Sequence, residues 1–111
     1  MNGAGRIAAE RRRQMEKEGW TPEHDDDHFD GALAWAAACY AAPEAIFRRT
    51  DIASGGAIFS DPFPRWKDKR RDLHSGRLIE PSQDQRIDLL VKAGALIAAE
   101  IDRLVRKEGE A

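Results

Sequence analysis

The segment 29–42 is apolar on nearly every face, and this constrains the fold more than any other part of the chain. Phe29, Leu33 and Tyr40 recur at helical spacing. Small residues fill much of the rest: Ala34, Ala37, Ala38 and Ala41. A helix that is apolar all round needs neighbours on most sides, so we expect this one at the centre of the protein. Pro43 cannot continue it and should close it at Ala42.

Two further segments have helical character. Residues 6–18 are good helix formers with a narrow apolar side, which favours a helix on the outside of the core, and Gly19 should end it. Ser82 and Gln85 form a capping box that begins a last helix. Apolar positions then repeat along that helix: Ile87, Leu90, Val91, Gly94, Ile97, Ala98, Ile101, Leu104 and Val105. We expect this stripe to face the core, with Gly94 at a close contact between helices.

The length of 111 residues fits a single domain, 1–111. Residues 1–5 are small and are expected to be flexible. Residues 50–81 are rich in turn formers but carry Phe59, Phe63 and Trp66, which indicate an ordered loop, with a very short strand possible at 57–59. The sequence therefore predicts an all-α fold, a small helical bundle of three long helices with a loop-rich insertion before the last helix.

Charge and composition exclude several classes of partner. The net charge of −2 argues against a general attraction to DNA or to an acidic membrane surface. No apolar run approaches the roughly 20 residues of a membrane span, and the N-terminus lacks a signal-peptide core. The single cysteine, Cys39, fits a reducing compartment. We therefore expect a cytoplasmic protein with no membrane partner, and DNA is not expected as a ligand.

The junction 18–28 joins the first helix to the central one. A turn at 20–22 leads into His24-Asp25-Asp26-Asp27-His28. The two histidines are four residues apart and would lie on one face of a helix, so His24, Asp25 and His28 could hold a divalent metal ion. The other interpretation is a solvated helix start with more capping carboxylates than it needs. The crowded carboxylates need positive charge nearby. Arginines at 11–13 are the favoured source, and the alternatives are a metal ion or a loop cation such as Lys67 or Arg70.

The segment 65–71 is basic and contains a tryptophan, which could stack on a base while its cations contact phosphates. A pocket between this segment and the junction would have these ligand-binding residues: Arg12, Arg13, Trp20, His24, Asp25, Asp26, His28, Trp66, Lys67 and Arg70. No Ser–His–Asp constellation, glycine-rich phosphate loop or paired-cysteine site is present in the sequence. A non-enzymatic binding protein without a cofactor is therefore our first hypothesis, with a divalent metal as the alternative.

Three blocks of the sequence resemble a family of small phage and prophage accessory proteins, most of which have no assigned function. The blocks are 10–14 with the motif Glu-Gly-Trp-Thr-Pro-Glu-His-Asp-Asp at 18–26, then 30–41, and 88–101. The resemblance implies a phage protein acting in the cytoplasm of the host cell. It would bind a nucleotide-like small molecule or a host protein, as an inhibitor of a host defence. A structural or DNA-packaging accessory is a further reading, which the weak net charge disfavours.

The tryptophan-bearing turn between a first and a central helix is also similar to small all-α nucleotide pyrophosphohydrolases of the MazG type. That likeness implies magnesium-dependent hydrolysis, with carboxylates of two helices holding the metal. Here the central helix carries alanines at the corresponding positions, and the last helix offers only Asp84, Asp88 and Glu100. A divergent hydrolase of this type is the alternative hypothesis.

The central segment is apolar on too many faces for two helices and a loop to cover. Uncovered apolar surface of this kind usually marks a partner interface. The sequence therefore predicts a homodimer or a larger homo-oligomer.

Overall fold

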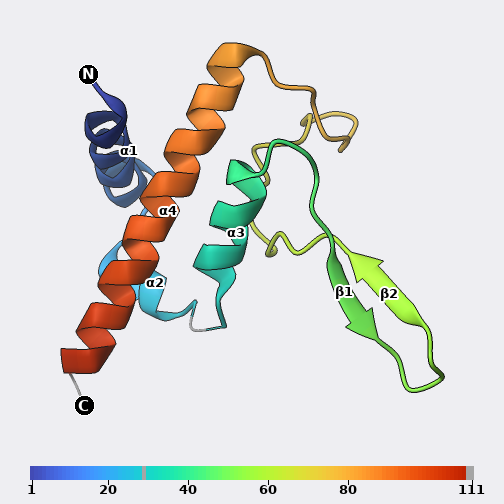
Figure 1. Ribbon diagram of the computed structural model, residues 1–111. Coiled ribbons are helices and arrows are strands. Elements are labelled where there is room, and N and C mark those ends of the chain that lie inside the picture. The colour runs from blue at the N-terminus through green and yellow to red at the C-terminus, as the bar shows by residue number, and fades with distance from the viewer. Residues whose placement is uncertain (29, 110–111) are drawn as a thin grey trace.

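The computed structural model describes residues 1–28 and 30–109 (Figure 1). In these ranges the chain forms four helices and one antiparallel two-stranded sheet. The elements in chain order are α1 (Gly3–Lys17), α2 (Pro22–Asp26), α3 (Ala32–Ala41), β1 (Arg48–Asp51), β2 (Ala57–Ser60) and α4 (Gln83–Gly109). Helix α4 is the axis of the molecule, and α1, α2 and α3 all pack against it.

The predicted all-α bundle of three long helices is wrong. The fold is mixed, because a β-hairpin begins two residues before the predicted insertion 50–81 and extends into it; Arg48 pairs with Ser60 and Asp51 with Ala57. The central helix has only 10 residues, whereas α4 has 27. The sequence of β1, Arg-Arg-Thr-Asp, has no alternation of apolar and polar residues, so periodicity could not identify it. The turn at Gly55, with a φ of 94°, and the backbone ladder hold the hairpin together.

Both ends of α1 are fixed by local hydrogen bonds. The helix begins at Gly3, inside the segment expected to be flexible, because the Asn2 side chain accepts a hydrogen bond from the Gly5 amide at 2.8 Å. It ends as predicted at Gly19, which has a φ of 72°. The Trp20 amide then donates back to the Gln14 carbonyl at 2.9 Å, which points the chain toward α2.

Helix α3 begins at Ala32, after Gly31 with a φ of 81°, and the Asp30 carboxylate accepts a hydrogen bond from the Ala32 amide at 3.2 Å. Phe29, where we expected the helix to start, lies outside the described residues. The helix ends at Ala41, close to the predicted boundary. Its last carbonyl groups are satisfied by Arg86 of α4, which donates to the carbonyls of Tyr40 at 3.0 Å, of Ala42 at 3.2 Å, and of Ala41.

The core lies between α3 and α4, as expected for the apolar central helix. Leu33 and Tyr40 are buried on α3, and Leu96 is fully buried on α4. Alanines surround them and let the two helices approach closely: Ala36, Ala37, Ala93 and Ala99. Trp20, Phe63 and Trp66 pack against the edge of this cluster, so the long connection between the hairpin and α4 contributes to the core.

The predicted register of α4 is wrong. Its buried residues are Leu89, Ala93, Ala95, Leu96, Ala99 and Arg103. The stripe that we expected in the core is largely exposed: Leu90, Ile97, Ile101, Leu104 and Val105. Both faces are apolar, and the alanine-rich face is the one on which α3 can pack closely. Gly94 does lie at a helix contact, since a Cβ atom there would be 2.5 Å from Cδ1 of Ile7 on α1.

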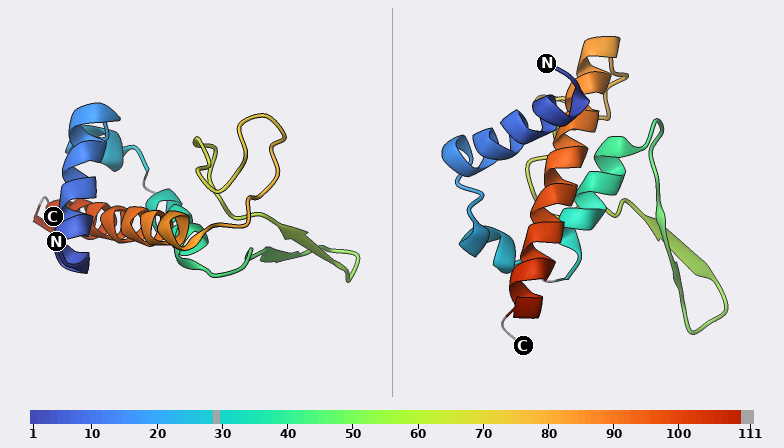
Figure 2. Two further views of the ribbon diagram at one scale, coloured as in Figure 1. Left: turned by 90° about the horizontal axis from the view of Figure 1, so that it is seen from above. Right: turned by 60° about the vertical axis from the view of Figure 1, so that its left-hand side comes forward.

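The hairpin projects away from the helices, as Figures 1 and 2 show. All four residues of β1 are exposed, and so are Ile58 and Phe59 of β2. Among the described residues, none of the helices is both long and apolar enough to span a membrane.

Candidate functional site

Four aromatic side chains gather where α1, α2 and the connection 61–81 meet. Trp20 and His24 have nearly parallel rings, with an interplanar angle of 6° and centroids 6.0 Å apart. Trp66 lies 5.7 Å from Trp20, and His28 lies 4.8 Å from both His24 and Trp66. These separations are typical of aromatic packing. We call Trp20, His24, His28 and Trp66 the aromatic cluster.

A pocket of about 180 Å³ opens beside the aromatic cluster. Its lining residues are Glu18, Trp20, His24, Trp66 and Lys67. We call it the aromatic pocket. It offers ring faces, one carboxylate and one ammonium group. This pocket lies between the junction and the segment 65–71, where we expected a ligand to bind.

A buried ion pair holds the junction against α1. Arg11 Nη2 lies 2.7 Å from Oδ2 of Asp25, whose side chain is 1% exposed. Arg11 Nη1 also donates to the Trp20 carbonyl at 3.1 Å. One guanidinium thus fixes both α2 and the turn that carries Trp20. Nδ1 of His24 faces the other oxygen of Asp25 at 3.4 Å, which orients the imidazole toward the pocket wall.

Arginines neutralise the acidic junction, but they differ from those expected. Asp25 pairs with Arg11, and Asp26 pairs with Arg106 of α4 at 2.9 Å. Arg12 is exposed, and Arg13 is bound to Glu10 at 2.6 Å and to Glu18 at 3.0 Å. Arg106 was missed because it is 80 residues away in sequence, where no local pattern points to the junction.

The proposed metal ligands His24, Asp25 and His28 do not form a three-ligand group. Within 1–28 and 30–109, no three histidine, cysteine, aspartate or glutamate side chains are placed to hold a metal ion together. The Asp25 carboxylate is occupied by Arg11. The two imidazoles pack on each other and on Trp66, which is an aromatic rather than a coordinating arrangement.

Burial sets the protonation of His28. It lowers the pKa of the imidazole below the usual value, and electrostatic repulsion from the neighbouring His24 ring acts in the same direction. The carboxylates of Asp25, Asp27 and Asp30 oppose this shift without cancelling it. His28 is therefore neutral near pH 7 and presents an uncharged ring to Trp66.

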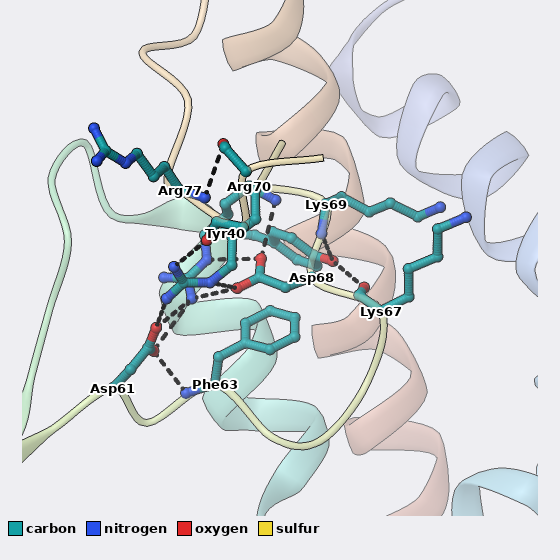
Figure 3. Close-up of polar contacts among 11 residues, drawn as sticks. Tyr40, Asp61, Phe63, Lys67, Asp68, Lys69, Arg70 and Arg77 are labelled. Carbon is teal, nitrogen blue, oxygen red and sulfur yellow. Dashed lines mark hydrogen bonds and ion pairs between the residues drawn. The ribbon is translucent and has the colours of Figure 1, made fainter. Parts of the chain in front are cut away.

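The segment that carries Trp66 is tied to the core through Tyr40 (Figure 3). The Tyr40 hydroxyl accepts a hydrogen bond from the Lys69 amide at 3.2 Å and donates to the Lys67 carbonyl at 3.5 Å. Burial raises the pKa of Tyr40 to about 12, so the hydroxyl keeps the proton that it donates. The pKa of Lys69 is lowered by burial and then by the positive charge of Lys67, so the two ammonium groups lie near each other.

Arg70 belongs to an ion-pair network instead of the pocket (Figure 3). Its guanidinium contacts Asp61 at 3.0 Å and Asp68 at 2.7 Å, and it lies 4.8 Å above the Phe63 ring. Arg71 contacts the same two carboxylates at 2.6 and 3.1 Å. Burial opposes ionisation of Asp61, but the Phe63 amide and the two guanidinium groups outweigh it and lower the pKa. The network fixes the fold of 61–71.

The structure therefore divides the predicted site residues into two groups. It brings together Trp20, His24, His28, Trp66 and Lys67. It places Arg13, Asp25, Asp26 and Arg70 in ion pairs, and Arg12 on the exposed surface. The sequence reading missed Glu18 and Lys69. Glu18 directly precedes Gly19, and its closeness to Trp20 in the sequence was the only sign that it lines the pocket.

Comparisons with protein-family models, with curated proteins and with solved structures found no match to this chain.

Proposed function

We propose that this protein is a non-enzymatic phage accessory protein that binds a nucleotide-like small molecule at the aromatic pocket. The observation that carries the proposal is an aromatic cluster at a cavity that also has Lys67 in its lining, with Lys69 two residues further along the chain. Aromatic faces stack on any nucleobase, and the ammonium groups neutralise a phosphate. A role against a host defence rests on the resemblance to phage proteins, and sequestering a nucleotide would be its mechanism.

The size of the pocket fits one part of such a ligand. At about 180 Å³ it lies below the roughly 300–1,000 Å³ of sites that enclose a drug-sized molecule. It would hold a base and leave the sugar and phosphates outside. The base would pack against Trp20 and Trp66, whose rings line the cavity.

The charges of the pocket favour one orientation of the ligand. Glu18 offers carboxylate oxygens, which accept hydrogen bonds from the amino or imino groups of a base and repel phosphate. Lys67 and Lys69 extend from the same part of the connection 61–81 (Figure 3). A phosphate beside them would relieve the repulsion between the two ammonium groups, which supports a phosphate position at this end.

Titration of a panel of nucleoside monophosphates, diphosphates and free nucleosides tests this proposal, with tryptophan fluorescence and calorimetry as readouts. We expect saturable binding that weakens at least tenfold in Lys67→Ala and in Trp66→Leu. The matched controls are Lys107→Ala and Trp35→Leu, which change the same residue types outside the pocket and should bind normally. Absence of binding across the panel at millimolar concentration would refute a nucleotide ligand and leave a host protein as the candidate.

The hydrolase alternative has no support in the geometry of the described residues. Helix α3 contributes no carboxylate, and Glu100 of α4 is bound to Arg103 at 2.6 Å. Incubation of the same nucleotides with magnesium or manganese separates the two hypotheses. We expect no turnover and no effect of a chelator on the melting temperature. Metal-dependent product release would restore the enzymatic hypothesis.

A further inference from the structure

Helix α4 has a second apolar face that none of the described elements covers along its C-terminal half. The side chains of Ile97, Ile101, Leu104 and Val105 are 48%, 55%, 50% and 60% exposed. Buried residues of the same helix, such as Leu96 and Ala99, lie on the opposite face and pack on α3. The helix is thus apolar on two sides, which is typical of a helix that is buried in an assembly.

The spacing of this face is that of a helix that pairs with another helix. Ile87, Leu90, Gly94, Ile97, Ile101 and Leu104 follow one another at alternating intervals of three and four residues. This is the heptad pattern in which side chains of one helix insert between those of a partner helix. Ile7 of α1 lies over the N-terminal part of this stripe at Gly94, whereas none of the described elements covers its C-terminal part.

The area of this face fits a small specific contact. Ile97, Ile101, Leu104 and Val105 are each about half exposed. Together they leave on the order of 400 Å² of mostly apolar surface open on one copy, so two copies would bury roughly 800 Å² of these side chains alone, and the polar atoms around them would bring the contact toward the roughly 1,000 Å² of specific interfaces. Glu108, which is exposed, continues this spacing four residues after Leu104, and a partner helix that ends there would leave its carboxylate at the polar rim of the contact.

The position of α1 decides the orientation. Ile7 of α1 lies over Gly94, so α1 crosses the same face of α4 in its N-terminal half (Figure 2). If two α4 helices packed in parallel, both α1 helices would lie at the same level and keep them apart. If they packed antiparallel, each α1 would lie beyond the C-terminal end of the other α4, and the open halves would meet.

We propose that a second copy of this chain covers the face formed by Ile97, Ile101, Leu104 and Val105, so that the protein is a homodimer built on antiparallel α4 helices. Ile101 of one copy lies level with Leu104 of the other. This placement buries the apolar residues of both copies and keeps the aromatic pocket out of the interface.

Sedimentation velocity at micromolar concentration tests the dimer. Wild-type protein should sediment with a molecular mass twice the 12.4 kDa of one chain. Ile101→Glu should sediment as a monomer and keep its circular dichroism, because the side chain is already half exposed. Leu104→Gln is a milder variant that should raise the dissociation constant at least tenfold. Phe59→Glu, on the equally exposed hairpin, is the control and should remain dimeric.

Disulfide trapping in a Cys39→Ala background tests the orientation. A mixture of Ile97→Cys and Glu108→Cys proteins should crosslink, because antiparallel pairing puts these positions level. Ile97→Cys alone should not crosslink, since the two copies of residue 97 would be roughly 16 Å apart along the helices. A monomeric wild type, a dimer that survives Ile101→Glu, or rapid crosslinking of Ile97→Cys to itself would each overturn the proposal.

Discussion

At the scale of single residues, buried charges are the most consequential feature of the site. Asp25 is 1% exposed and depends on Arg11, which also holds the Trp20 carbonyl. A buried ion pair contributes little net stability compared with apolar residues, but removal of one partner leaves a charge without compensation. The position of the aromatic cluster therefore depends on an arginine that does not touch the pocket.

We expect Arg11→Ala to lower the free energy of unfolding by about 3–5 kcal/mol, because it leaves the buried Asp25 carboxylate with only the 3.4 Å contact to His24. Urea unfolding followed by circular dichroism measures this. Arg12→Ala, one residue away and exposed, should change the stability by less than about 0.5 kcal/mol. Equal effects of the two substitutions would mean that Arg11 does not hold the junction.

His28 makes stability depend on pH in a defined window. Burial depresses its pKa below the usual 6.5, so the unfolded chain binds the proton more readily than the folded chain. Its contribution is fully present above pH 6.5 and is lost as the pH falls toward the depressed value. Melting temperatures should therefore fall between pH 7 and pH 5, and the fall should be smaller in His28→Gln. The lowered pKa values of Glu10 and Asp61 act only below about pH 4.5.

At the scale of the elements, close contact between helices depends on small residues. Gly94 lets α1 cross α4, because any Cβ atom there would meet Ile7. Alanines do the same between α3 and α4. The larger side chains of α4 are consequently left on its other face. Close packing of small residues thus explains both the core and the exposed apolar stripe.

Gly94→Leu should destabilise the protein by about 1–3 kcal/mol, because the added side chain cannot fit beneath Ile7. Thermal unfolding gives the change. Ile7→Ala should restore part of the stability in the double variant, since it removes the group that the leucine meets. If Ile7→Ala and Gly94→Leu were simply additive, the two positions would not be in contact in solution.

At the scale of the whole molecule, stability is unevenly distributed. The hairpin of β1 and β2 projects from the helices, and its strands are exposed on both sides. An isolated two-stranded hairpin is marginally stable in water. The α3–α4 core, by contrast, contains the most buried side chains.

Amide hydrogen exchange should show this difference. Amides of 48–60 should exchange through local opening, at least a hundredfold faster than those of the buried residues of α3 and α4. The rate for the hairpin should not change with mild denaturant, whereas exchange of the core should accelerate. Equal protection of both regions would show that the hairpin is stabilised by a further contact.

The local structure follows from the sequence alone. Asn2, Gly19, Ser82 and Gln85 act on neighbours a few residues away, and Gly19 and the capping box of α4 were correctly predicted. The sequence also indicated most of the aromatic cluster, because Trp20 and His24 lie within one motif and Trp66 lies in the basic segment 65–71. These features depend on interactions between residues close in the chain, so the order of residues is enough to predict them.

Contacts between distant segments set which face of α4 is buried and which cations neutralise the junction. Both faces of α4 are apolar, so periodicity is the same for either choice, and the closer fit of Ala93 and Ala99 against α3 selects one. Arg106 reaches Asp26 only because α4 runs past α2. The hairpin forms through backbone pairing, and the side chains of Arg48–Asp51 carry no pattern that predicts it. Contacts between segments distant in the chain depend on how the side chains fit together and on how far apart the folded segments lie. Local sequence patterns give neither.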